Sequence, residues 1–329
     1  MVAPDAAPPA IDSLSASPNR PLFSVMIPTF NCAEYLRVCL RSVLAQDLGP
    51  EIMQIEVIDD CSTLDDPEAV VRELGSGRVA FTRQAHNVGA VANFNSCIRR
   101  ATGELVHILH GDDYVLNGFY TAISQRAAEH PTAGMYATAV KFVDEAGTVR
   151  NNGGSLSCFG VEVSHQIRRF EAGTPLQFAG TVVRRDSYEQ LGGFLPGLVH
   201  VADWEMWIRI VASRGIAAVP EQLAAYRIFE ASHSSGLART AENLADIERG
   251  LRVVQERGIA LREHVVLLSV RRRAQSQAFR LAQRGDDEGA RANLKFWEAR
   301  ATPRERLRRL VGLVLHRTPP STWQETPPG

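Results

Sequence analysis

The stretch LFSVMIPTFNCAEYLRVCLRSVLAQ, residues 22–46, contains two hydrophobic patterns in succession. Residues 22–28 are almost wholly apolar and end at a proline, which is typical of a strand buried on both faces. After a short polar segment, apolar residues recur at helical spacing at Leu36, Leu40, Val43 and Leu44. We therefore expect a buried strand followed by an amphipathic helix.

The same alternation continues along the chain. Further strands are expected at residues 52–60, 78–84 and 103–109, with helices between them at 66–74 and 88–102. Asp66 and Pro67 suit the N-cap and the first position of the helix at 66–74. Strands that alternate with helices at this spacing form βαβ units. The expected fold class is therefore α/β, with a mostly parallel sheet between helices.

The two ends of the chain differ from this middle part. Residues 1–20 are rich in Pro, Ala and Ser, which predicts a disordered N-terminal arm. The α/β domain is expected over residues 21–235, with loops or a hairpin over its site between Ala139 and Pro175. Residues 236–329 have helical patterns, including a helical hairpin around Gly285 and a basic amphipathic last helix. That last helix can lie on an anionic membrane surface or dock on the preceding helices.

Composition excludes several classes of protein. With 329 residues, 45% of them hydrophobic and 22% charged, the chain is expected to be soluble and globular. A net charge of −1 argues against nucleic acid as a partner. Five cysteines without a C-x-x-C spacing support neither disulfides nor zinc, so we expect a reducing, cytoplasmic location. Neither a signal peptide nor an apolar run of membrane-spanning length is recognisable.

Polar residues follow three of the expected strands. These segments are residues 28–31 (PTFN), 59–63 (DDCST) and 111–113 (GDD). In open parallel sheets, ligands bind beyond the carboxyl ends of the strands. An isolated Asp pair would indicate only a turn or a helix cap. Two acidic strand ends at one edge would repel, however, unless a cation or hydrogen-bond donors lie between them. A divalent metal ion suits residues 112–113, and the N–H or hydroxyl donors of a nucleotide suit residues 59–60.

Several motifs together resemble those of one enzyme family. They are FSVMIPTFNCAEYLRVCLRSVLAQ, IEVIDDCST, NVGAVANFNSCIRRATGELVHILHGDD, LGGF and VADWEMWIRI, in this order. Over residues 21–235 the chain resembles the family 2 inverting glycosyltransferases, which have the nucleotide-diphospho-sugar transferase (GT-A) fold. The resemblance implies a nucleotide-diphospho-sugar donor, with a UDP-sugar as the expected one. It also implies a glycan, a lipid-linked molecule or a small molecule as the acceptor.

The resemblance implies nucleotide-binding roles at the first two strand ends. Pro28 and Phe30, with Thr29 between them, would flank the nucleobase, and Asp60 would accept a hydrogen bond from its N–H. A second motif beside the nucleotide is matched by Asn87, Gly89 and Asn93. For this motif the alternative is structural, with Asn87 as a helix cap and Gly89 in a tight turn.

The resemblance also implies a metal site and a catalytic base. Asp112 and Asp113 would form the D-x-D-type pair for Mn²⁺ or Mg²⁺, with Asp113 the more direct ligand and Asp112 also beside the nucleotide. Asp203 would be the catalytic base that takes the proton of the acceptor hydroxyl. Two alternatives stay open: Asp203 as a plain N-cap, and Glu205 as the base.

Two positions depart from the family pattern. The family often has a histidine shortly after a Tyr-Arg pair, where it can reach the metal or the diphosphate. Here Phe229 stands at that place, and His233 follows four residues later. His233 is therefore either a substitute metal ligand or a solvated loop residue. His110, before the glycine of residues 111–113, would contact the sugar or cap the strand.

Three function classes are consistent with these observations. The first is a metal-dependent inverting glycosyltransferase. The second is a sugar-nucleotide nucleotidyltransferase of similar sheet architecture, although no Gly-rich loop with Arg or Lys follows the first strand. The third is a non-catalytic, nucleotide-sugar-binding partner of an assembly. A homo-oligomer is compatible with all three.

Overall fold

The computed structural model describes residues 7–14, 19–154, 156, 163–229 and 233–306. They form two compact units. The first reaches Phe170 and continues over Thr174–Phe229, and the second consists of Glu171–Gly173 and the helices after residue 232. The basic last helix predicted from the sequence falls mostly after residue 306 and lies outside the described residues.

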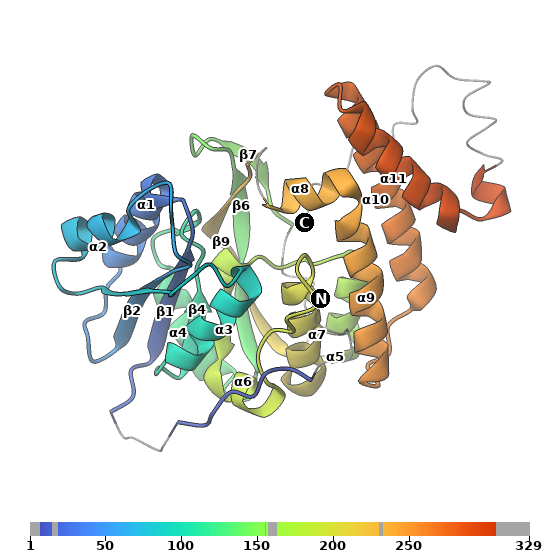
Figure 1. The fold of residues 1–329 in the computed structure, drawn as a ribbon. Helices are drawn as coiled ribbons and strands as arrows, with labels where there is room; N and C mark the ends of the chain where they lie inside the picture. Colours follow the sequence, from blue (N-terminus) through green and yellow to red (C-terminus); the bar gives the residue numbers. More distant parts are fainter. Residues whose placement is uncertain (1–6, 15–18, 155, 157–162, 230–232, 307–329) are drawn as a thin grey trace. The chain divides into compact units, whose positions relative to one another are not determined.

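The first unit is built on one mixed sheet, drawn in Figure 1. Its strand order is β3-β2-β1-β4-β8-β6-β9-β5, with β7 paired to β6. The strands are β1 (Phe23–Thr29), β2 (Met53–Asp59), β3 (Ala80–Arg83), β4 (Leu105–Ile108), β5 (Tyr114–Val115), β6 (Met135–Val143), β7 (Val149–Asn152), β8 (Thr181–Arg184) and β9 (Ile216–Arg227). The helices are α1 (Ala33–Leu44), α2 (Pro67–Gly75), α3 (Ala90–Arg100), α4 (Phe119–Glu129), α5 (Val163–Arg168), α6 (Arg185–Leu191) and α7 (Ala202–Arg214).

One half of the sheet is parallel, as expected. Strands β3, β2, β1 and β4 pair in parallel and are joined by α1, α2 and α3. The other half is mixed, because β8 pairs antiparallel with both β4 and β6, whereas β6 and β9 are parallel. The β6–β7 hairpin falls in the region where a hairpin or loops were expected, but residues 139–143 belong to the sheet itself.

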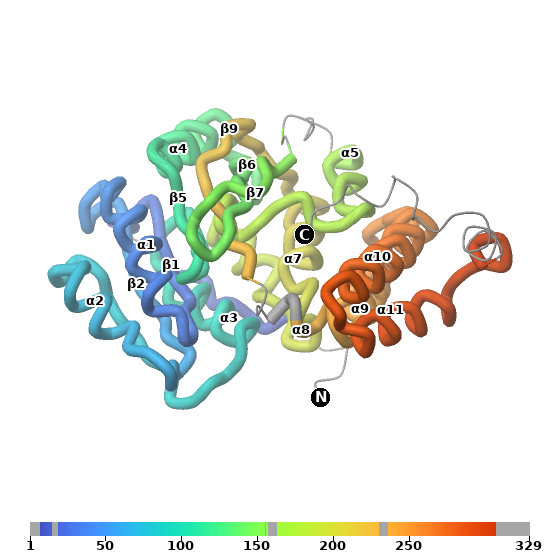
Figure 2. Tube along the Cα trace, turned by 90° about the horizontal axis from the view of Figure 1, so that it is seen from above, coloured from blue at the N-terminus to red at the C-terminus, as the bar shows by residue number. Residues whose placement is uncertain are grey.

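Helices cover both faces of the sheet around β1. Every residue of β1 is buried, which confirms the interpretation of its continuous apolar run. Phe23, Val25 and Ile27 pack in one core cluster with apolar residues of α1, α2 and α4. Met26 is fully buried outside this cluster, and α3 contacts β1, β2 and β4. Figure 2 shows α1 next to β1 and β2, with α2 beside α1. The carboxyl ends of these strands are therefore held at one edge of a rigid core.

His107 lies in β4 and is fully buried. Its Nδ1 is 3.2 Å from the Tyr120 hydroxyl, and its Nε2 is 3.1 Å from the carbonyl oxygen of Ala179. Burial lowers the pKa of His107 to about 3, so the folded protein keeps this imidazole neutral at pH 7. The unfolded chain takes up the proton near pH 6.5.

We expect His107 to make the free energy of unfolding depend on pH. Because its folded pKa is lowered, its stabilising contribution is present above about pH 6.5. It is lost between that pH and about 3, by up to about 1.4 kcal/mol per pH unit. The variant His107→Gln keeps a donor and an acceptor without this titration. Urea unfolding of both proteins at pH 7, 6 and 5 should show that the free energy of unfolding falls less with decreasing pH in the variant. An identical fall in both proteins would refute the lowered pKa of His107.

Part of the N-terminal segment contacts the first unit. Ile11 is only 4% exposed, and the backbone N–H of Gly193 donates to the carbonyl oxygen of Pro9 at 2.8 Å. Arg20 donates to the carbonyl oxygen of Gly103 at 3.0 Å. These residues differ from the disorder expected for residues 1–20, because their apolar side chains and backbone groups find partners on the domain.

The second unit contains α8 (His233–Thr240), α9 (Glu242–Glu256), α10 (Glu263–Gln283) and α11 (Asp287–Arg300). Helices α10 and α11 form the helical hairpin predicted around Gly285, whose φ of 76° suits glycine. Asp286 caps α11 by accepting a hydrogen bond from the N–H of Gly289 at 3.0 Å. Among the described residues, no helix has the length and apolar character needed to cross a membrane.

Candidate active site

A five-residue loop, residues 109–113, joins β4 to β5 and contains His110, Gly111, Asp112 and Asp113. Gly111 brings this loop against the end of β1. A Cβ atom at that position would lie 3.0 Å from Oγ1 of Thr29 and 3.1 Å from Sγ of Cys32. A larger residue would push the loop away, so the glycine sets where the two carboxylates stand.

Arg227, at the end of β9, fixes the same loop from the other side. Its backbone N–H donates to Oδ1 of Asp113 at 2.8 Å, and its Nε donates to the carbonyl oxygen of Asp112 at 3.0 Å. Its Nη1 donates to the carbonyl oxygens of Asp144 and Glu145, each at 2.8 Å. The guanidinium also lies over the rings of Tyr35 and Tyr114. Arg227 therefore fixes the conformation of the loop.

The two carboxyl groups of the loop are held under electrostatic strain. Burial raises the pKa of Asp113 well above its usual range, and the neighbouring Asp112 raises it further. Burial also raises the pKa of Asp112. Oδ2 of Asp113 is buried without a hydrogen-bond partner among the described residues. A divalent cation would relieve both the repulsion and the missing partner, so these residues fit a metal site.

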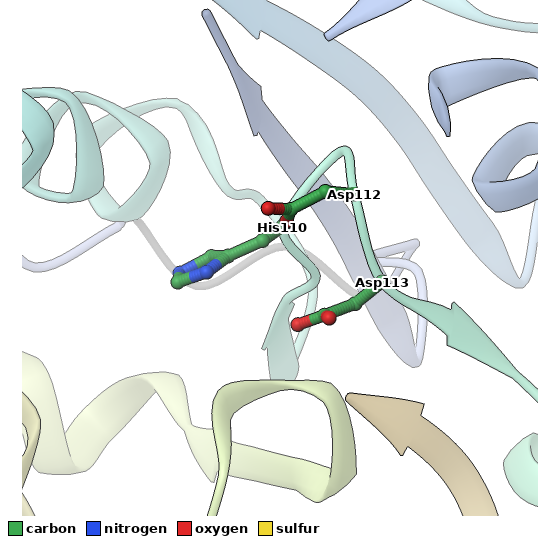
Figure 3. Close-up of side chains that lie close together, drawn as sticks. All are labelled: His110, Asp112 and Asp113. Atoms are coloured by element: carbon green, nitrogen blue, oxygen red, sulfur yellow. The ribbon is translucent and has the colours of Figure 1, made fainter. Parts of the chain in front are cut away.

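His110 belongs to the same group of side chains, as Figure 3 shows. One nitrogen of its imidazole and one oxygen from each of Asp112 and Asp113 all lie within 4.8 Å of one another. Burial lowers the pKa of His110 to about 4, so the ring is neutral at pH 7. The sequence left the role of His110 open, and the structure places it beside the carboxylate pair.

Asp203 lies in the first turn of α7 and shares its surroundings with the carboxylate pair. The helix begins at Ala202 after Val201, so the N-cap alternative for Asp203 is wrong. Its Oδ1 instead accepts a hydrogen bond from the N–H of Trp204 at 2.7 Å. Burial raises the pKa of Tyr226, and Asp113, Asp112 and Asp203 each raise it further. The charges of Asp203 and of the β4 loop therefore both act on the Tyr226 hydroxyl.

Glu205 does not have the surroundings of a catalytic base. It is fully buried, and both of its oxygens accept hydrogen bonds at 2.9 Å from Arg209. Arg209 also donates to the carbonyl oxygen of Gly193 at 3.0 Å. Glu205 and Arg209 therefore anchor α7 to the Leu-Gly-Gly-Phe segment, and Asp203 is the carboxylate of this turn that stays partly exposed.

The loop after β1 presents one aromatic side chain. Phe30 is 45% exposed, whereas Pro28 and Thr29 are buried. The next residue, Asn31, has a φ of 50°, and its Oδ1 accepts hydrogen bonds from the N–H groups of Thr63 and Leu64. These bonds join the loops after β1 and β2. The expected base-flanking surface is therefore reduced to Phe30, with Pro28 and Thr29 supporting it from within the strand.

Asp60 organises the turn before α3. It is 3% exposed, its Oδ1 accepts from the N–H of Val88 at 2.8 Å, and its Oδ2 accepts from the N–H of Gly89 at 3.0 Å. Gly89 has a φ of 85°, and Oδ1 of the exposed Asn87 also accepts from its N–H, at 3.1 Å. This geometry is the tight turn considered for Gly89, but Gly89 is itself the N-cap of α3, so Asn87 does not cap the helix.

Asn93 has a structural environment rather than an open one. It is 2% exposed, its Nδ2 donates to the carbonyl oxygen of Ile58 at 3.0 Å, and its Oδ1 accepts from Gln84 at 3.0 Å. Its amide therefore joins α3 to β2 and is not available to a ligand. The prediction that Asn93 binds the nucleotide is therefore wrong. The motif alone does not show which side of the helix faces the sheet.

His233 begins α8, but its side chain is outside the described part of the structure, so its expected metal role stays a prediction. Phe229, at the family's histidine position, packs its ring on Tyr35 with centroids 5.0 Å apart. Sequence reasoning missed Tyr226 and Arg227. The Tyr-Arg pair at the end of a long strand was visible, but nothing local in the sequence linked it to the carboxylates.

Comparison with known proteins completes this description. The family model for glycosyl transferase family 2 matches residues 24–192, which is more than half of the chain and includes the β4 loop. The chain belongs to glycosyl transferase family 2. This membership confirms the enzyme class expected from the motifs, and it places the protein among glycosyltransferases rather than nucleotidyltransferases or non-catalytic partners.

Of two relatives that are similar in sequence to this chain, one is named as a glycosyltransferase. The chain is 29% identical to the uncharacterized protein MT1568 of Mycobacterium tuberculosis over 72% of this chain and 76% of that protein. It is 35% identical to a GalNAc(5)-diNAcBac-PP-undecaprenol beta-1,3-glucosyltransferase of Campylobacter jejuni. That match covers 33% of this family 2 chain and 35% of the Campylobacter protein.

Solved structures confirm the GT-A fold. The mannosyltransferase PcManGT of Pyrobaculum calidifontis, in complex with GDP-Man and Mn²⁺, aligns with a TM-score of 0.56. It is 18% identical, and the alignment covers 94% of this chain and 83% of PcManGT. TarS 1-349 of S. aureus, in complex with UDP-GlcNAc, aligns with a TM-score of 0.54 at 18% identity, over 84% and 91% of the two chains. At these identities the likeness shows the fold.

Proposed function

We propose that this protein is a metal-dependent inverting glycosyltransferase that moves a sugar from a nucleotide-diphospho-sugar to an acceptor hydroxyl. The observation that carries the proposal is the Asp112–Asp113 pair, in which Oδ2 of Asp113 is buried without a hydrogen-bond partner among the described residues. This pair suits a cation, and Asp203 stands in the first turn of a separate helix, where its charge raises the pKa of Tyr226 together with theirs.

Asp112 and Asp113 would hold Mn²⁺ or Mg²⁺, and the unpartnered Oδ2 of Asp113 supports this assignment. When bound, the divalent ion supplies charge neutralisation to the leaving diphosphate. Arg227 orients both aspartates through its backbone N–H and its guanidinium. The metal site of this chain is therefore set by β9 as well as by the loop itself.

Asp203 takes the proton of the acceptor hydroxyl as that oxygen attacks the anomeric carbon. Attack from the face opposite the leaving group inverts the configuration of that carbon. A carboxylate in position contributes about 10²- to 10⁴-fold to such a step. Burial and the charges of the three carboxylates raise the pKa of Tyr226, which keeps the phenol protonated as a hydrogen-bond donor.

Phe30 and Asp60 bind the base. The exposed ring of Phe30 offers a stacking surface. Each oxygen of Asp60 accepts one backbone N–H and retains a second lone pair, which can accept an N–H from a base. Uracil and thymine offer such a donor at N3 and guanine offers one at N1, whereas adenine offers only its amino group. We propose a uridine nucleotide as the donor, with thymidine and guanosine nucleotides as alternatives that the same contact accepts.

We expect UDP, TDP or GDP to compete better than ADP for the donor site. The measurement is displacement of a labelled UDP-sugar in the presence of Mn²⁺. Asp60→Asn should reduce the preference among the diphosphates, because its amide presents only one acceptor oxygen. If ADP competes best with the wild-type protein, the role of Asp60 is wrong.

The names of two relatives guide the proposal for the acceptor. The Campylobacter enzyme is named for a PP-undecaprenol-linked acceptor, and TarS is named as a poly(ribitol-phosphate) beta-N-acetylglucosaminyltransferase. We propose a glycan, a lipid-linked molecule or a small molecule as the acceptor. Assays of transfer to each of these classes with one radiolabelled donor distinguish them.

A further inference from the structure

Two histidines of the first unit, the buried His107 and the half-buried His110, differ in their hydrogen bonds. His107 has both ring nitrogens within hydrogen-bond distance of protein oxygens, which is the usual state of a structural histidine. His110, three residues later, has a buried Nε2 without a partner among the described residues. An unpartnered nitrogen inside a protein costs free energy, so its retention beside the carboxylates points to a ligand.

The ring of His110 is held in place by aromatic neighbours. It is stacked on Phe94 with centroids 5.0 Å apart and an interplanar angle of 12°, and it contacts Phe178 at 4.6 Å. Rotation away from the carboxylates would break these contacts. The imidazole is therefore held in one orientation by packing, which a side chain that binds a metal ion directly requires.

The spacing of the group matches a metal centre. Ligand atoms about 2.1 Å from an ion lie about 4.2 Å apart when they are opposite one another. The nitrogen of His110 and the oxygens of Asp112 and Asp113 lie within 4.8 Å of one another, so small side-chain rotations bring all three onto one ion. Within this group, Oδ2 of Asp113 is also buried without a partner among the described residues, and Asp113 is only 1% exposed.

We infer that His110 is a third protein ligand of the divalent ion, so that the loop forms a His-Asp-Asp site selecting transition metals over Mg²⁺. This inference deepens the metal site of the proposed function and rests on it. Carboxylates and water suit Mg²⁺ and Mn²⁺, whereas imidazole favours transition metals such as Co²⁺ and Zn²⁺. Mn²⁺ accepts both ligand types, and Mg²⁺ requires near-ideal octahedral oxygen coordination.

The test is pulsed electron paramagnetic resonance of Mn²⁺ on the full-length protein, with and without UDP. The bound ion of the wild type should show electron spin-echo modulation from an imidazole nitrogen. His110→Gln should lose this modulation, and His233→Gln, the other histidine considered as a ligand, should keep it. Loss of the modulation in His233→Gln and not in His110→Gln would overturn the inference.

Metal preference gives a second readout that does not depend on turnover. Calorimetry should show that the wild type binds Mn²⁺ or Co²⁺ more tightly than Mg²⁺. In His110→Asp the ratio of the Mn²⁺ affinity to the Mg²⁺ affinity should fall by about tenfold, because an oxygen ligand replaces a nitrogen ligand. An unchanged ratio together with wild-type Mn²⁺ that lacks nitrogen modulation would refute the role of His110 and leave the metal-dependent function intact. Wild-type protein that binds no divalent ion, even with UDP, would refute both.

Discussion

Asp203→Asn should lower turnover by about 10²- to 10⁴-fold while the affinity for the donor changes little. Asparagine retains an oxygen that can accept the hydrogen bond from the N–H of Trp204, so the first turn of α7 keeps its geometry. What the variant lacks is a basic oxygen for the proton of the acceptor. The measurement is steady-state transfer with saturating donor, beside donor binding by calorimetry.

Glu205→Gln is the matched control, because it changes a second carboxylate in the same helical turn. Glu205 is fully buried and paired with Arg209 through two hydrogen bonds. Breaking such a pair should destabilise the protein by about 3–5 kcal/mol. Asp203→Asn should therefore keep its thermal midpoint and lose turnover, whereas Glu205→Gln should lose thermal stability. Near-normal turnover of Asp203→Asn would show that another group is the base.

Asp113→Asn should abolish the dependence of donor binding on metal. The amide oxygen can still accept the hydrogen bond from the N–H of Arg227, so the loop keeps its shape. The negative charge and the free carboxylate oxygen are lost. Calorimetry should show that Mn²⁺ increases the affinity for UDP strongly in the wild type and not at all in the variant.

The same substitution should also change stability without metal. Burial and the charge of Asp112 raise the pKa of Asp113, so its ionised form is disfavoured in the folded protein at pH 7. Asp113→Asn should therefore raise the thermal midpoint of the metal-free protein. Asp66→Asn is the control, since asparagine caps α2 about as well as aspartate and lies outside the site. If Mn²⁺ increases the affinity of Asp113→Asn for UDP as much as it does for the wild type, the assignment of Asp113 as a metal ligand is wrong.

The parallel half of the fold could be predicted from local patterns. The apolar run at 22–28 corresponds to β1 at Phe23–Thr29, and Asp66 caps α2 as expected, through the N–H of Ala69. The antiparallel half could not be predicted in the same way. Strand β8 pairs with β4 and β6, which are distant in sequence, and no pattern within β8 specifies those partners.

The site was predictable where it depends on the same parallel strands. The carboxyl ends of β1, β2 and β4 meet at one edge, so Phe30, Asp60 and the Asp112–Asp113 pair were found from their positions after strands. Arg227 was not found, because it lies 114 residues beyond Asp113 and reaches it only through the pairing of β9. The bonds of Asn93 and Glu205 to the protein interior were likewise invisible without the tertiary structure.

The most direct test of the account is release of nucleoside diphosphate and transfer of label from radiolabelled UDP-GlcNAc, UDP-glucose and GDP-mannose, each with Mn²⁺ and with a chelator. If the protein is a metal-dependent inverting glycosyltransferase, the wild type uses a uridine donor only when the divalent ion is present. Asp203→Asn should bind this donor and transfer almost no label. Equal transfer with Mn²⁺ and with the chelator, or full transfer by Asp203→Asn, would contradict this function.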